Sequence, residues 1–318
     1  MQITQILNVF KRINRDVGWV SILVGGNGVY FVRLKRTVSQ VEVLMCEFHP
    51  IENVSSAELE KLVRDRNLGA FQFTTLLAPD EYQILMVDAP NVPAEELKTA
   101  VRFRIKDSLN YHVDEATVDV LQIPGNANSG NRPQSLFAVA ASNEILRKRI
   151  SMFEKAKINL TVIDIPEMAQ RNIAALYETE GRGLALLSFD DRGGLLTFTS
   201  GGELFLARRM DITSGQLLDA NENVRQQYVE RVELEIQRSM DYFDRQFHYI
   251  SLGKMLVSAP EGAGLVKLFA NSLGLPVEAI NLAGIFDISA TPALLNHDFV
   301  TEALPAVGAA LRQERRKQ

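Results

Sequence analysis

The sequence predicts a mixed α/β protein of two lobes, because two stretches about half a chain apart share one pattern. Residues 183–210 contain three apolar runs separated by the turn residues DDRGG and SGG, which is typical of a three-stranded meander. Residues 18–36 likewise contain an apolar run, a glycine-rich turn and a second, alternating run. A repeated unit of strand, glycine turn and strand builds two-lobed phosphate-binding folds, with one loop of each half facing a cleft. Two unrelated hairpins are the alternative interpretation.

Length and composition place the chain among globular proteins of two domains. It has 318 residues, of which 46% are hydrophobic and 23% charged. The net charge of -5 and the pI of about 5.6 argue against wholesale nucleic-acid binding, which needs a basic face. The single cysteine, Cys46, excludes an intramolecular disulfide, fits a reducing compartment, and is interpreted as a strand residue. Because no apolar run reaches the roughly 20 residues of a transmembrane helix and no signal peptide is recognisable, we expect a cytoplasmic protein.

Both ends of the chain carry basic residues. Residues 1–16 are predicted to form an amphipathic helix, which packs on its own domain, lies on a membrane surface or binds a partner helix. The last residues, RQERRKQ, form either a solubilising end or an attraction for an anionic membrane. Peripheral membrane association therefore stays open.

The first half of the chain alternates strands and helices. Strands are predicted to about residue 43, and a helix at 57–65 follows the capping signal Ser55-Ser56. Residues 72–79 and 82–90 are predicted as two more strands, and the five strands are expected to form one mixed sheet. The remaining elements predicted here are a helix at 94–109 with one basic face, strands at 116–123 and 135–141 forming a hairpin, a helix at 144–157, a strand at 160–165 and a helix at 166–177. The basic face is either a solvated surface or an anionic binding site.

The second half begins after the break at Gly181 and Gly183 with the meander. It continues with the longest predicted helix, at 224–247, and then a strand, a glycine loop at 260–264 and a short helix. This loop is either a tight connection or a place where helix-end amides meet an anion.

Motifs for catalysis and metal binding are lacking. The four histidines are scattered without zinc-ligand spacing, and the sequence has no GxSxG elbow, GxxxxGK[ST] loop or GxGxxG after a strand. The acid pairs Asp190-Asp191 and Glu95-Glu96 are interpreted as turn and helix-capping residues. We therefore predict no metal site, no catalytic residue and no enzyme activity.

Several stretches together resemble the PilM family of type IV pilus assembly proteins, and particularly its MshI relatives from mannose-sensitive haemagglutinin (MSHA) pili. The resemblance spans nearly the whole chain and rests on VPAEELKTAVRFRIKDSLNYHVDEATVDV, IDIPEMAQRNIAAL, VELEIQRSMDYFDRQF, KMLVSAPEGAGLVKLFANSLGLPVEAINL and ALPAVGAALR. It implies a duplicated actin-like fold of the FtsA and PilM type. By this resemblance the first lobe spans 17–178 with a small subdomain inserted at about 78–142, and the second spans 179–318 with a reduced upper subdomain.

The resemblance also implies three nucleotide loops, and this sequence departs from the family pattern at each. In the first loop, Leu23 stands where the family has an aspartate, and Tyr30 where it often has a lysine. In the second loop, Ser188 replaces the family's aspartate and Asp190 its glycine. In the third, Ala259 and Pro260 stand where the family has paired glycines. The loop residues left as vestigial cofactor-binding candidates are Gly25, Asn27, Gly28, Asp190, Gly193, Gly262 and Gly264. Without either aspartate, magnesium lacks an acidic anchor. We therefore predict a pseudo-ATPase without cofactor, with weak binding of ATP and magnesium as the alternative.

By the same resemblance the function is that of a cytoplasmic scaffold at the inner membrane. Its partner is expected to be a PilN-like or MshJ-like inner-membrane assembly protein, whose short cytosolic segment folds on binding beside the inserted subdomain. Two alternatives are kept. One is an actin-like ATPase with Asp190 or Asp191 at the metal, and the other is a membrane-surface protein using the two basic ends.

Overall fold

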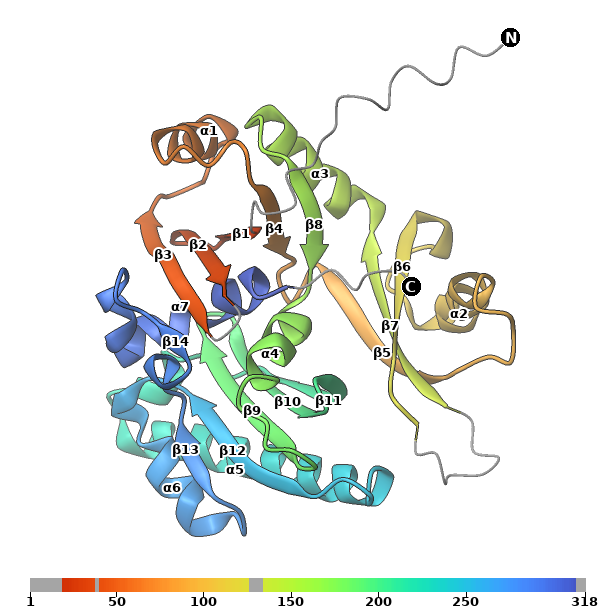
Figure 1. The fold of residues 1–318 in the computed structure, drawn as a ribbon. Coiled ribbons are helices and arrows are strands. Elements are labelled where there is room, and N and C mark those ends of the chain that lie inside the picture. Colours follow the sequence, from red (N-terminus) through yellow and green to blue (C-terminus); the bar gives the residue numbers. More distant parts are fainter. Residues whose placement is uncertain (1–18, 38–39, 126–133, 313–318) are drawn as a thin grey trace.

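A computed structural model describes residues 19–37, 40–125 and 134–312. The predicted helix at 1–16 and the basic residues beyond 312 lie outside the described residues. Figure 1 shows two larger sheets, one above the other, with helices between them and on their outer faces, and a small sheet at one side.

The first sheet has the strand order β14-β3-β2-β1-β4-β8. Strands β1 (Trp19–Val24), β2 (Gly28–Arg36) and β3 (Val41–Pro50) form an antiparallel meander. Beyond β1 the sheet continues with two parallel strands, β4 (Gln72–Leu76) and β8 (Leu160–Asp164). Helices α1 (Ser56–Asp65) and α3 (Asn143–Lys155) cover one face, where Leu59 and Phe153 pack with Phe31 and other apolar residues. Ser55 and Glu58 form a capping box that fixes the start of α1. The predicted strands and both helices are confirmed here, within a few residues.

A separate antiparallel sheet follows β4, with the strand order β5-β7-β6. It consists of β5 (Tyr82–Asp88), β6 (Ala116–Gln122) and β7 (Ser135–Ser142), and α2 (Leu97–Ile105) covers one face. The prediction of a single five-stranded sheet is therefore wrong, because β5 pairs along its whole length with β7 and leaves the first sheet. The predicted hairpin of β6 and β7 is confirmed. Helix α2 is shorter than predicted, since residues 106–108 tighten into a 3₁₀ turn.

The second sheet has the order β11-β10-β9-β12-β13 and contains the predicted meander. Its strands are β9 (Gly183–Asp190), β10 (Gly193–Ser200), β11 (Glu203–Met210), β12 (Leu252–Ser258) and β13 (Val277–Ala279). Helices α5 (Glu222–Gln246) and α6 (Leu265–Ser272) cover the outer face, where Val232, Ile236 and Phe243 pack on Leu187 and Phe198. The alternation of buried residues along β9, with Leu186 inward and Leu187 outward, places apolar layers on both faces.

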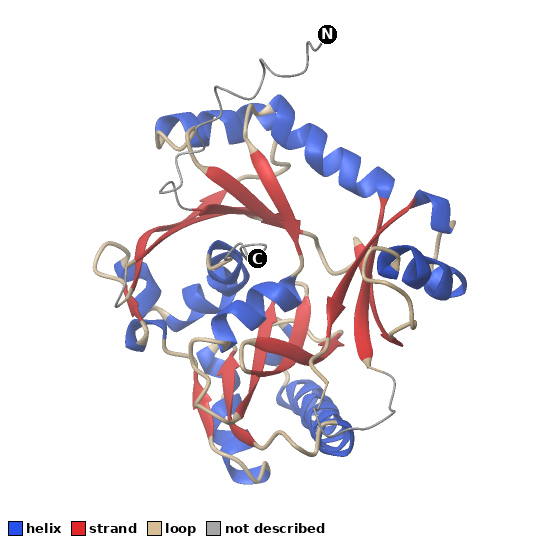
Figure 2. Ribbon diagram, turned by 45° about the vertical axis from the view of Figure 1, so that its right-hand side comes forward, coloured by secondary structure: helices blue, strands red, loops and turns tan. Residues whose placement is uncertain are grey.

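Two helices, α4 (Pro166–Ala174) and α7 (His297–Ala310), fill the space between the larger sheets. Figure 2 shows the same layering from another side. The helices meet closely, because a Cβ on Gly308 would lie 2.2 Å from the carbonyl oxygen of Ala169. Helix α4 ends before the predicted residue 177, in a turn whose amides bond three residues back. Strand β14 (Phe286–Asp287) pairs with β3, so the chain returns to the first sheet before α7.

The repeated strand and turn units thus open two similar sheets on either side of a central helix pair. The boundary of the lobes at 179 and the reduced upper subdomain stay predictions. Among the described helices, none is both long and apolar enough to cross a membrane.

Candidate functional site

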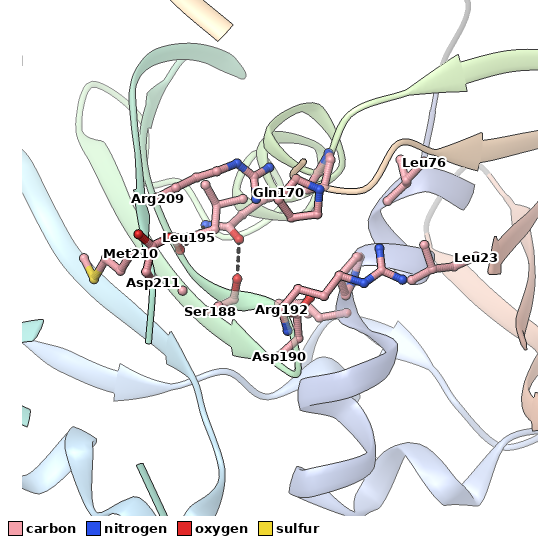
Figure 3. A pocket seen from close by; sticks show the side chains of 16 residues that line it. Leu23, Leu76, Gln170, Ser188, Asp190, Arg192, Leu195, Arg209, Met210 and Asp211 are labelled. Atoms are coloured by element: carbon pink, nitrogen blue, oxygen red, sulfur yellow. Dashed lines mark hydrogen bonds between the residues drawn. The ribbon is translucent and has the colours of Figure 1, made fainter. Parts of the chain in front are cut away.

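A small cavity lies between the two larger sheets, at the ends of β1, β4 and β9 (Figure 3). Its lining comes from both sheets and from the central helices, and includes Leu23, Leu76, Gln170, Ser188, Asp190 and Arg209. The open volume is about 60 Å³, whereas pockets for small molecules usually have roughly 300–1,000 Å³. The cavity therefore has room for a few water molecules.

The first glycine turn, with Gly25, Asn27 and Gly28, joins β1 and β2. Gly28 is required sterically, because its φ is +157° and a Cβ there would lie 2.2 Å from the carbonyl oxygen of His49. Leu23 is 8% exposed and belongs to the core around α4 and α7. Tyr30 packs against Phe48, with ring centroids 4.6 Å apart, and burial raises the pKa of its hydroxyl. The end of β1 at this turn is therefore packed with apolar side chains.

The second turn, between β9 and β10, reaches across to the first. The Nη2 of Arg192 donates a hydrogen bond of 3.0 Å to the carbonyl oxygen of Val24. Asp190 accepts a bond from the backbone N–H of Arg192, and the Arg192 Nε lies 3.8 Å from Asp191 Oδ1. Ser188 donates a bond of 2.6 Å to Gln170 Oε1 (Figure 3). The two turns therefore meet through protein side chains.

Three carboxyl groups lie near this contact: those of Asp190 and Asp191 on the second turn, and that of Glu302 on α7. Ser214 Oγ donates a bond of 3.4 Å to Glu302 Oε1. Burial, followed by the nearby charges of Asp191 and Asp190, raises the pKa of Glu302 to about 7. Burial also raises the pKa of Asp190. In the described part of the chain, no group of three or more His, Cys, Asp or Glu residues is arranged to hold a metal ion.

The third loop stands apart from the other two. Gly262 lies beside Leu218, and Gly264, with φ +64°, precedes α6. Gly264 lines a second, open hollow of about 720 Å³, between α6 and the residues that begin α7. This hollow shares no lining residue with the cavity at Ser188 and Asp190. The structure therefore brings the first two predicted loops together and leaves the third beside a separate depression.

A buried polar triad joins the small sheet to the second lobe. Tyr82 of β5 donates a hydrogen bond to Glu167 Oε2 and accepts one from Arg209 of β11. Glu167, on α4, is completely buried, and its Oε1 lies 2.9 Å from Arg209 Nε. Burial, followed by the charge of Glu167, raises the pKa of Tyr82 well above its usual range. The triad thus links three parts of the molecule, and Arg209 also lines the cavity.

A different surface lies where the small sheet meets β8 and α3. Buried Leu77, Tyr82, Ala141 and Ile165 form its base. Partly exposed apolar side chains pack over this base, and we call them the seam: Ile84, Leu121, Val139, Ile145, Leu146, Ile163 and Met168. Strand β8 is the edge of the first sheet as described, so one side of its backbone is free to pair. The seam therefore offers apolar contacts beside an unpaired strand.

Sequence reasoning found the glycine turns but missed the residues that close the cleft. Arg192 follows the acid pair in a turn, and nothing in the sequence shows that it reaches Val24. Tyr82, Glu167 and Arg209 are separated from one another by 42 to 127 positions, so no local spacing signals their triad. The seam was expected only as a region beside residues 78–142, because some of its members lie within that insertion and the others follow it in the chain.

Comparison with solved structures places this architecture in a known class. No protein-family model and no curated protein matches the chain. The chain has the two-lobed actin-like fold, as the sequence predicted. A chain of the PilM–PilN type IV pilus biogenesis complex superposes with a TM-score of 0.71 and 16% identity, covering 93% of this chain and 98% of that chain.

Weaker similarity extends to two further structures. The cytoplasmic domain of EpsL, an inner-membrane component of the type II secretion system of Vibrio cholerae, has a TM-score of 0.45 and 12% identity over 82% of this chain and 85% of that one. A protein of Bacteroides thetaiotaomicron with an actin-like ATPase fold and unknown function has a TM-score of 0.49 and 9% identity, covering 90% of this chain and 98% of that one. At 16% identity, the similarity to the chain of the PilM–PilN complex shows the fold alone.

Proposed function

We propose that the protein is a scaffold of type IV pilus biogenesis, of the MSHA kind, at the cytoplasmic face of the inner membrane. Its partner is the cytosolic N-terminal segment of a PilN-like or MshJ-like membrane protein. The seam is the observation that carries this proposal, because partly exposed apolar side chains beside an edge strand suit an extended peptide. Similarity in fold to a chain of the PilM–PilN complex supports the choice of partner.

We further propose that the cleft does not turn over nucleotide. Leu23 and Ser188 lack the carboxylates that would anchor magnesium, and Arg192 already neutralises charge beside Asp190 and Asp191. A cavity of about 60 Å³ does not accommodate a nucleotide in the closed arrangement described. These contacts support a pseudo-ATPase without cofactor.

The proposal is tested by titrating the protein with a synthetic peptide of the PilN-like partner's cytosolic segment. Ile163→Asp on β8 and Leu121→Asp on β6 place a charge in the seam on strands at sheet edges, so each is expected to weaken binding at least tenfold. Leu295→Asp is the matched control, because Leu295 is 72% exposed and lies in the second lobe. Wild-type affinity in both seam variants, with an unchanged melting temperature, would exclude the seam as the binding surface.

One observation favours a second candidate function, an ATPase with unusual ligands. Burial, followed by the nearby charges of Asp191 and Asp190, raises the pKa of Glu302 to about 7, so the cleft still holds three neighbouring carboxyl groups. Magnesium-dependent hydrolysis that disappears in an Asp190→Ala, Asp191→Ala double variant would establish it. Hydrolysis that survives in that variant would point to a contaminant.

A further inference from the structure

Tyr82 lies in the base of the seam and bonds to Arg209, which lines the cleft cavity. Its ring packs in the apolar base beneath the seam, and only 7% of the side chain is exposed. Its hydroxyl points the other way, to Glu167 and Arg209. A side chain with its ring in one region and its polar end in another is suited to couple their positions.

Glu167 holds the residues of this link in one arrangement. It is completely buried, and its two oxygens are taken by the Tyr82 hydroxyl and by Arg209. A buried carboxylate that loses either partner is strongly destabilised, so the pairing favours one arrangement of β5, α4 and β11. Arg209 also lies 5.4 Å from the centroid of the Tyr82 ring, which ties it to the ring as well as the hydroxyl.

The neighbours of Glu167 on α4 carry the link into the cleft. Pro166 and Gln170 line the cavity together with Arg209. Gln170 donates bonds of 2.6 Å and 3.1 Å to the carbonyl oxygens of Leu186 and Leu195, and accepts one from Ser188. A displacement of α4 or β11 therefore also displaces β9 and β10, the strands on either side of the second turn.

We propose that the Tyr82–Glu167–Arg209 triad transmits occupancy of the seam to the cleft, so that a bound segment holds the two lobes closed. A peptide over Ile84, Val139 and Ile163 presses on the base that holds the Tyr82 ring. The triad then keeps β11 against α4. As a consequence, the hydrogen bond from Arg192 to the carbonyl oxygen of Val24 breaks less often. This proposal rests on the proposed function, because it needs an occupant in the seam.

The test is hydrogen exchange of backbone amides at residues 188–194, with and without a saturating synthetic peptide of the PilN-like cytosolic segment. In the wild-type protein the peptide is expected to slow exchange there at least fivefold. In Tyr82→Phe, which keeps the ring and loses the hydroxyl, the peptide is expected to bind within threefold of wild type and to slow exchange less than twofold. Arg209→Lys, which keeps the charge but loses the forked contact, is expected to behave in the same way.

Tyr249→Phe is the matched control. Its hydroxyl also joins the second lobe to the end of β6, through a bond of 3.2 Å to the carbonyl oxygen of Pro124, but it is outside the triad and the seam. It should retain the full fivefold effect. Peptide binding with unchanged exchange in the wild type, or a full effect in both triad variants, would overturn the coupling and leave the proposed function intact. Failure of the peptide to bind wild type would overturn both.

Discussion

Pro166 and Gln170 of α4 line the cleft and Met168 of the same helix belongs to the seam, but the two regions differ in whether their side chains already have partners within the protein. In the cleft the polar groups bond to one another: Arg192 to Val24, Ser188 to Gln170, and Arg209 to Glu167. In the seam the side chains are apolar, partly exposed and next to an edge strand. Binding of a partner is most favourable where a surface leaves apolar side chains exposed to water. This difference supports our proposal that the partner binds at the seam and that the cleft holds the two lobes together without a ligand.

The largest effect is expected from breaking the triad between these regions. Glu167→Leu leaves Arg209 without its carboxylate, and should lower the free energy of unfolding by about 3 kcal/mol, since removing one partner of a buried pair strands a charge. Chemical denaturation measures this value. Glu278→Ala, which breaks the more exposed pair with Lys254, should cost less than about 1 kcal/mol. Equal losses in the two variants would show that the triad has no special role.

The contact of the central helices should give the next largest effect. In Gly308→Ala the new Cβ would lie 2.2 Å from the Ala169 carbonyl oxygen, so α4 and α7 must separate. The expected loss is about 2 kcal/mol, because overpacking outweighs the better helix propensity of alanine. Gly69→Ala has no atom within 4 Å of its added Cβ and should lose far less. A stable Gly308→Ala protein would mean that the helix joint tolerates movement.

The carboxyl groups of the cleft make stability depend on pH. Glu302 has an ordinary pKa of 4.5 and a folded pKa of about 7, so the folded state holds its proton more tightly. Its contribution is therefore fully present below pH 4.5, is lost as the pH rises to about 7, and changes no further above that. Because the group is only partly buried, we expect about 1 kcal/mol. The pH profile of unfolding should lose this component in Glu302→Gln, and an unchanged profile would contradict the assignment.

The smallest effect is expected at the contact between the two turns. Arg192→Ala removes the bond to Val24 and should cost about 1 kcal/mol or less, since the side chain is partly exposed. We expect faster hydrogen exchange at residues 24–28 together with slightly weaker peptide binding, because coupling between the seam and the cleft acts in both directions. Peptide affinity that is unchanged despite the faster exchange would contradict the coupling through the triad.

Local sequence patterns were sufficient to predict most helices and strands, but not how the strands assemble into sheets. Alternating apolar residues and glycine turns predicted the strands of both larger sheets, and Ser55 and Ser142 marked the starts of two helices. The pairing of β5 with β7 could not be predicted, because both partners are short apolar strands that would also fit the first sheet. In the cleft, the sequence located the two glycine turns that meet at Arg192 and Val24. The reach of Arg192 and the triad could not be predicted, because both depend on tertiary distances. The loss of nucleotide binding through Leu23 and Ser188 stays a prediction.

A thermal-shift titration with Mg-ATP, up to millimolar concentration, tests most directly whether the cleft has lost nucleotide binding. A ligand at 100 times its dissociation constant stabilises a protein by about 2.7 kcal/mol, which is a shift of several degrees. We predict no shift from a protein that melts cooperatively. A saturable shift that requires magnesium would show that the turns at Gly25 and Asp190 still form a nucleotide site, and would contradict the central claim.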